Sequence, residues 1–341
     1  MARGRAAGES VSGGPRASSG VSHVFATPCL GEPMLVAGEV HTGLLRGRDP
    51  LTPDQARCLL DLVVGEPVLV SHRPIAYVRS PDIPVGVDCG IGGTRRVRGI
   101  GTALQHATLT GGHVVQGSAA TTLVPADGAA RRPWSHYLTR PGVIETLGRT
   151  RWDEVAANLS GPERPGDALD LGAMAGRTAD RVQRSTSRSG PARLRAARTR
   201  LRWTARVGEE PGIRFSVRSD GLRLLDLSVA GVRPGPARGL TALAEDIALH
   251  DWLLSTVLEI VGKSAVGVIE RHAALQRLLP AIDYLLHLWM PGARGDEMSE
   301  AVWAALDRLA GFARQWETLV HRIRDQLSAG AVEALAAARP R

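Results

Sequence analysis

The sequence predicts an α+β protein, with a β-rich N-terminal region that contains hairpins, a mid-chain β-meander and an α-helical C-terminal bundle. Gly111 and Gly112 separate two long apolar runs, and glycine supplies the positive φ that a tight hairpin turn requires. Ile213, Phe215 and Val217 alternate with polar residues, as in a strand with one buried face. After residue 239, apolar residues recur at helical spacing. Runs of strands followed by runs of helices are typical of α+β folds.

The N-terminal region is expected to contain short strands, one helix and one hairpin. Thr52 is a typical N-cap residue and Pro53 suits the first helical turn, so we expect a helix at 53–64. The stretch 80–93 is rich in Pro, Gly and Asp, and we expect a loop there. Strands are predicted at 34–40, 68–70, 75–78, 97–109 and 113–124.

The middle and C-terminal regions are expected to change from strands to helices. A mixed segment at 133–150 is followed by helices at 152–160 and 168–184, strands at 201–207, 213–218 and 222–229, and helices at 240–261, 272–290 and 299–337. In the last helix, apolar residues recur with a seven-residue period over four heptads: Val302, Leu306, Leu309, Ala313, Trp316, Val320, Ile323 and Leu327. Such a seam packs inside its own bundle, or it pairs with a partner or a second copy of the chain.

Composition divides the chain into four parts. The first residues are mostly Gly, Ser, Ala and Arg with no apolar stretch behind them, so we expect a disordered tail at 1–25 and no signal peptide. We further expect a β-rich domain at 26–150, a helical Arg-rich connector with the β-meander at 151–231, and a helical domain at 232–337.

Overall composition favours a soluble, cytoplasmic protein. The chain has 341 residues, of which 43% are hydrophobic and 22% are charged, as in ordinary globular domains. Its three cysteines form no CxxC pair, which favours a reduced compartment. The most apolar stretch, 249–261, contains His250, Asp251 and Glu259 and is too short to span a bilayer, so we expect no membrane span.

Positive charge is concentrated in one segment. The formal net charge is +8, and the segment 181–206 holds nine arginines and no acid. On a helix, Arg195, Arg198 and Arg202 would share a face suited to phosphate contact. The segment is interpreted as a solvated connector, as a docking site for an acidic partner, or as a nucleic-acid contact. The candidate residues for partner or phosphate contact are Arg193, Arg195, Arg198, Arg200 and Arg202.

Three acids precede a histidine by four residues, which places each pair on one helical face. The pairs are Asp246 with His250, Asp283 with His287, and Glu317 with His321. A metal site built from facing helices would use such pairs, with Asp246, His250, Asp283 and His287 as the candidate ligands. The simpler interpretation is a buried His250 held by Asp246 and solvated pairs elsewhere, so we assign no metal site.

No motif assigns a catalytic residue or a cofactor. Gly262-Lys263-Ser264 resembles the end of a phosphate-binding loop, but Val257 stands where that loop needs glycine. The glycine-rich stretch 90–95 has Arg95 where a dinucleotide fingerprint needs its third glycine. The neighbours Ser135 and His136 are no evidence for a catalytic triad, because triad members meet through the fold.

Several segments together resemble an uncharacterised, streptomycete-type actinobacterial protein family of unknown function. These segments are GEVHT at 38–42, LTP at 51–53, RPIAY at 73–77, PWSHYL at 133–138, RPGV at 140–143, ALHDWLL at 248–254 and HLWMPG at 287–292. Genes of that family tend to lie beside one for a variant P-loop protein. The resemblance implies a cytosolic multi-protein system, and it implies no catalytic or binding residue.

We therefore expect a non-enzymatic partner-binding subunit, a scaffold or accessory protein, with a P-loop NTP-binding protein as a candidate partner. One alternative is a nucleic-acid-associated protein that acts through the Arg-rich connector. A second alternative is a metal-dependent enzyme in the helical region. A homo-oligomer formed through the last helix is also an open expectation.

Overall fold

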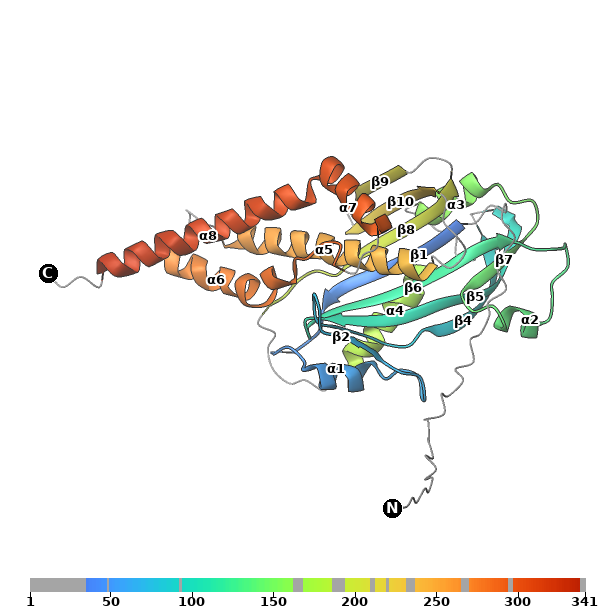
Figure 1. The fold of residues 1–341 in the computed structure, drawn as a ribbon, viewed down its shortest axis with the longest axis horizontal. Helices are drawn as coiled ribbons and strands as arrows, with labels where there is room; N and C mark the ends of the chain where they lie inside the picture. Colours follow the sequence, from blue (N-terminus) through green and yellow to red (C-terminus); the bar gives the residue numbers. More distant parts are fainter. Residues whose placement is uncertain are drawn as a thin grey trace, which may run out of the picture.

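The computed structural model describes residues 35–47, 49–91, 94–161, 168–185, 194–208, 212–218, 221–230, 237–264, 270–293 and 297–337. The strands are β1 (Leu35–Leu44), β2 (Leu69–Ser71), β3 (Tyr77–Arg79), β4 (Ile83–Ile91), β5 (Thr94–Thr110), β6 (Val114–Pro125), β7 (Val143–Leu147), β8 (Thr199–Gly208), β9 (Gly212–Val217) and β10 (Leu222–Ala230). The helices are α1 (Pro53–Leu60), α2 (Trp134–Leu138), α3 (Trp152–Ser160), α4 (Leu171–Ser185), α5 (Ala237–Lys263), α6 (Arg271–Tyr284), the 3-10 turn η1 (Leu286–Leu288), α7 (Glu297–Ala310) and α8 (Phe312–Ala337). Strands followed by C-terminal helices confirm the α+β class (Figure 1).

The described strands form one mixed sheet in the order β2-β3-β5-β7-β6-β1-β8-β10-β9, with β4 paired to β5. The predicted hairpin is confirmed, and Gly111 and Gly112 at its turn have φ values of 58° and 73°. Strands β5 and β6 pair near this turn and then separate, and β7 lies between them. Strand β7 is antiparallel to β5 and parallel to β6.

The strands at 199–230 complete the N-terminal sheet, because β1 pairs with β6 on one edge and with β8 on the other. The segments 26–150 and 151–231 thus both supply strands to one sheet. The expected meander order is not observed, since β10 lies between β8 and β9 and runs parallel to β8. Strand β10 is the more apolar of the two later strands, with Leu222, Leu225 and Leu227 buried, and an apolar strand is favoured in the sheet interior.

The expectation of a loop at 80–93 is wrong, because residues 83–91 form strand β4. Among the described strands β4 pairs with β5 alone, apart from an isolated bridge between Gly90 and Ala168, so it lies at a sheet edge. Proline has no N–H to donate to a neighbouring strand, and an edge strand tolerates it. The Pro and Gly content of this segment therefore reflects an edge position.

Helices cover both faces of the sheet: α5 crosses one face, and α3 and α4 lie on the other (Figure 1). Side chains of β1 alternate between the two cores, so that Val36 and Val40 pack in the α5 core and Leu35 and Ala37 in the α4 core. Gly117 on β6 permits the close approach of α4, because a Cβ there would lie 2.2 Å from the carbonyl oxygen of Ala175.

Helix α5 is in turn covered by α6, α7 and α8 (Figure 1). The expected helix at 272–290 ends at Tyr284, and η1 follows it. The expected continuous helix at 299–337 is broken at Gly311, whose φ is 68° and whose N–H donates to the Leu306 carbonyl at 3.2 Å. The prediction of a four-heptad apolar seam on one helix is therefore wrong. Leu309, which belongs to the predicted seam, is 67% exposed.

The predicted start of α1 is confirmed. Thr52 accepts a hydrogen bond from the Gln55 N–H, and the Gln55 side chain accepts one from the Thr52 N–H. This reciprocal arrangement is a capping box. Helix α1 ends at Leu60, four residues earlier than expected. Among the described helices, none is both long enough and apolar enough to cross a membrane.

Candidate functional site

Arg195, Arg198 and Arg202 do not share a helical face, because residues 194–198 are not helical and Arg202 lies in a strand. Residues 199–208 are strand β8, so Arg200 and Arg202 lie on one face of the strand and Leu201 and Trp203 on the other. Arg202 is only 5% exposed, and its Nε donates to Glu39 Oε2 on β1 at 3.0 Å. The interpretation of Arg202 as a surface phosphate contact is therefore wrong.

The other arginines of that set have different surroundings. Arg195 is exposed, and Arg198 forms an ion pair with Asp180 of α4 at 2.7 Å. Arg200 is partly buried. Arg193 lies outside the described residues.

The pair Asp246 and His250 holds the C-terminal helical layer together. His250 is fully buried, donates from Nδ1 to the Asp246 carbonyl at 2.7 Å, and accepts at Nε2 from the Met290 N–H at 3.1 Å. Asp246 Oδ2 accepts from the Gly292 N–H and from Trp303 Nε1, both at 2.9 Å. The expectation of a buried histidine held by Asp246 is confirmed.

The second candidate pair, Asp283 and His287, is exposed. Because α6 ends at Tyr284, these two residues do not share a helical face. Within the part of the chain that the structure describes, no group of three or more His, Cys, Asp or Glu residues is placed to hold a metal ion.

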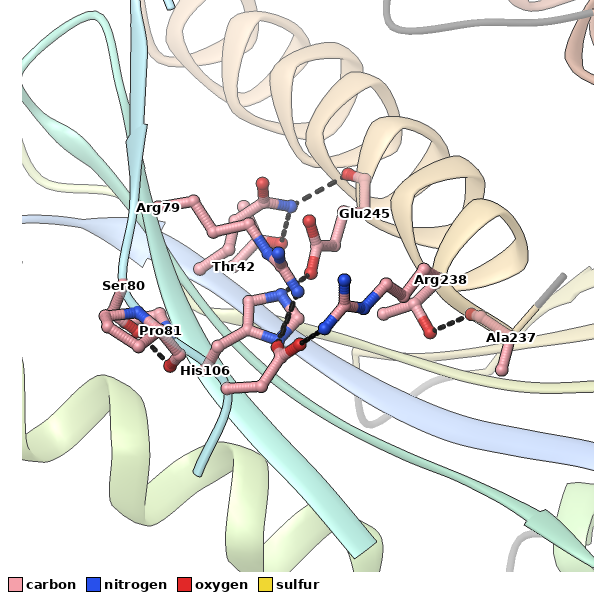
Figure 2. A network of polar contacts seen from close by, with 12 residues as sticks. Thr42, Arg79, Ser80, Pro81, His106, Ala237, Arg238 and Glu245 are labelled. Carbon is pink, nitrogen blue, oxygen red and sulfur yellow. Dashed lines mark hydrogen bonds and ion pairs between the residues drawn. The ribbon is translucent and has the colours of Figure 1, made fainter. Parts of the chain in front are cut away.

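A charged cluster that is not apparent from the sequence lies under the N-terminal half of α5 (Figure 2). His106 on β5 contacts two carboxylates: its Nε2 bonds to Oε1 of Glu245 on α5, and its Nδ1 lies 3.2 Å from Oδ1 of Asp82. Arg79 on β3 donates to Asp82 Oδ1 at 2.6 Å, and Arg238 on α5 lies 3.2 Å from Asp82 Oδ2. We call these five residues the His106 cluster.

The His106 cluster is most buried at its centre. His106 and Glu245 are 3% and 2% exposed, while the Arg238 side chain is 76% exposed at the rim. Burial lowers the pKa of His106, but the Glu245 charge and the hydrogen bonds to Asp82 and Glu245 more than compensate, so the pKa is raised overall. Burial likewise raises the pKa of Asp82, and the contacts with His106, Arg79 and Arg238 lower it overall. The two carboxylates thus stabilise the charged form of His106, while the nearby Arg79 guanidinium opposes it.

The floor of the cluster is polar. Gln116 on β6 donates from Nε2 to the backbone carbonyl of Glu245 at 2.8 Å and to Thr42 Oγ1 on β1 at 3.2 Å. The sequence signal for this floor is weak but present. Polar residues recur at every second position at the end of β5, at His106, Thr108 and Thr110, where they alternate with Ala107 and Leu109.

This arrangement fixes α5 to the sheet and does not form a nucleophilic triad. Ser118 pairs with His106 in the strand register, so the two side chains lie on the same face. Both ring nitrogens of His106 face carboxylates, however, and neither is available to accept a proton from Ser118 Oγ. The described cluster can hold a charge and orient a helix, and it shows no exposed nucleophile.

Comparisons with known proteins give this site no counterpart. No protein-family model matches the chain, and no curated protein and no solved structure matches it.

Proposed function

We propose that the protein is a non-enzymatic partner-binding subunit, a scaffold or accessory protein of a cytosolic multi-protein system. Its docking element is the C-terminal half of α8, residues 326–337, which we call the α8 extension. The candidate partner is a variant P-loop protein, as the family resemblance implies.

The exposure of the α8 extension carries the proposal. The first half of α8 is buried against the protein, with Trp316 and Ile323 at 7% and 2% exposed. In the extension, Leu327, Val332 and Leu335 are 39%, 66% and 70% exposed. The helix extends past the end of α5 in Figure 1.

The composition of the α8 extension supports docking to another protein. Glu333 is its only charged residue, and the remainder is Gln, Ser, Gly, Ala, Val and Leu. A helix that is apolar on several sides is normally buried, and exposed apolar patches mark interaction sites. Small residues also permit close approach of a second helix.

Co-purification with the candidate partner tests this function. The tagged chain is produced together with the variant P-loop protein, and the cleared lysate is treated with nuclease so that nucleic acid cannot bridge the two. We expect the wild type to retain the partner. The double variant Leu327→Arg, Leu335→Arg should retain at least tenfold less of it. Val64→Arg is the matched control, because Val64 is also an exposed apolar residue but lies near α1.

Two outcomes would contradict the proposal. If the wild type and the double variant retain the partner equally, and circular dichroism shows that both are folded, the α8 extension is not the docking element. If the wild type retains no P-loop protein, that protein is not the partner. Light scattering of the purified chain then shows whether a second copy occupies the extension, since the double variant would convert a dimer to a monomer.

A further inference from the structure

Besides Trp203 Nε1 on β8, three buried side-chain polar atoms, all on strands β5 and β6, have no hydrogen-bond partner among the residues that the structure describes. They are Thr108 Oγ1, Gln116 Oε1 and Ser118 Oγ, and all three residues are 0% exposed. More than nine in ten buried polar groups are hydrogen-bonded, and ordered water is a frequent partner. Three unpaired groups in one place therefore indicate a common partner.

The strand register places these three side chains together. Thr108 pairs with Gln116, and Ser118 pairs with His106, so all three belong to two adjacent rows across β5 and β6. Opposite Cβ atoms in an antiparallel pair lie about 4.5–5.5 Å apart. The Gln116 amide is held by its bond to the Glu245 carbonyl, which fixes the position of Oε1. One small molecule can therefore reach all three groups.

The surrounding charges favour a neutral molecule. The carboxylates of Asp82 and Glu245 are already matched by His106, Arg79 and Arg238 (Figure 2). Gln116 Oε1 needs a donor, and the two hydroxyls each offer a donor and an acceptor. Water has two donors and two acceptors and satisfies all three groups at once.

We infer that ordered water is bound between α5 and strands β5 and β6, where it bridges Thr108, Gln116 and Ser118. The N-terminal half of α5 thus rests on a hydrated polar layer next to the His106 cluster. Its C-terminal half packs against the rest of the protein through its own apolar side chains, such as Trp252, Leu253 and Val257, all 0% exposed. Asp251 in that half adds a buried ion pair with Arg223 on β10. The hydrated layer is thus confined to the N-terminal half of the helix.

Nuclear magnetic resonance tests for the water directly. A water molecule that stays bound for longer than nanoseconds gives nuclear Overhauser effects to nearby amide protons. These effects have the same sign as those between protons of the folded protein itself. We expect such effects at the amides of Thr108, Gln116 and Ser118, and none at those of Leu253 and Val257. Absence of these effects at all five amides would overturn the inference.

A double-mutant cycle tests the shared bridge by stability. Ser118→Ala and Thr108→Val each remove one hydroxyl with little change of shape. If water bridges them, each variant lowers the folded-to-unfolded ratio by about tenfold, and the double variant costs less than the two combined because either change breaks the same bridge. If the hydroxyls are unpaired and dry, the variants leave stability unchanged or raise it, and their effects add.

Thr121→Val is the matched control for this cycle. Thr121 Oγ1 donates directly to the Thr102 carbonyl at 3.1 Å, so its loss lowers stability without water. Its effect should add to that of Ser118→Ala. Coupling between Ser118 and Thr121 as strong as that between Ser118 and Thr108 would contradict a local bridge.

Discussion

His106 is the residue whose protonation most directly affects the attachment of α5. Its folded pKa is raised above the ordinary value of about 6.5, so its contribution to stability is complete below that pH. The contribution is lost as the pH rises through the folded pKa. Asp82 has a lowered pKa, so its contribution is present above about pH 4 and is lost as the pH falls through its folded pKa.

The variant Glu245→Gln should therefore show a pH-dependent loss of stability. We expect the difference in melting temperature between wild type and Glu245→Gln to be largest between about pH 4 and 6.5 and to shrink at higher pH. Comparing the two proteins isolates the effect of His106. His113 and His287 have lowered pKa values, so their titration raises the stability of both proteins as the pH rises. Glu259→Gln, on the same helix in an exposed pair with Lys263, is the control. A difference that does not change with pH contradicts this account.

Asp246 has a structural role that a simple substitution can measure. Asp246→Ala leaves the Trp303 Nε1–H and the Gly292 N–H without their acceptor. Unpaired buried donors each cost about 1–3 kcal/mol, so we expect a loss of about 3 kcal/mol in urea unfolding. Asp283→Ala is the control, because Asp283 is exposed and should change stability by less than about 0.5 kcal/mol.

The sequence could identify Asp246 with His250 but not His106 with Glu245. The first pair is separated by four residues on one helix, and helical geometry makes such neighbours visible in the sequence. His106 and Glu245 come from a strand and a helix 139 residues apart, and only the packing of α5 on the sheet brings them together. For the same reason, the partnership of Arg202 with Glu39 was not visible from the arginine count.

At the scale of the element, two glycines should respond to the same substitution in opposite directions. Gly311 ends α7 with a φ of 68°, which an alanine adopts at a cost of about 1 kcal/mol or more. Gly262 lies inside α5, and a Cβ added there would meet no atom within 4 Å beyond its own helix turn, so alanine should add about 0.5–1 kcal/mol of stability. Urea unfolding of Gly311→Ala and Gly262→Ala checks both signs. Equal effects would contradict the assignment of Gly311 as the helix end.

Element types were more predictable than element neighbours. The hairpin turn at Gly111, the cap at Thr52 and the span of α3 follow from local residue patterns. The order of β8, β10 and β9 depends on which strand is buried on both faces, and that is a property of the whole sheet. Strand β4 was not predicted, because proline and glycine occur in edge strands as well as in loops.

At the scale of the whole molecule, the described residues should unfold as one unit. Helix α5 covers a sheet face built from β1, β6 and β8, and its polar contacts reach β5 and the connection between β3 and β4. Removing residues 232–337 would expose Trp203 and Leu201, which are 0% and 2% exposed. We expect circular dichroism and tryptophan fluorescence to give the same urea midpoint. Two separate transitions would show that the sheet and the helical layer are independent domains.

The pairing of β1 with β8 has a consequence for protein synthesis. Leu35 pairs with Arg206, so the edge of β1 remains open until β8 has been made. At about 5–20 residues per second, the ribosome needs roughly 10–30 s to extend the chain from β1 to the end of β8. During this time the open backbone can recruit a strand from a neighbouring nascent chain. The yield of folded protein should therefore depend on translation speed and on chaperones that shield the nascent chain.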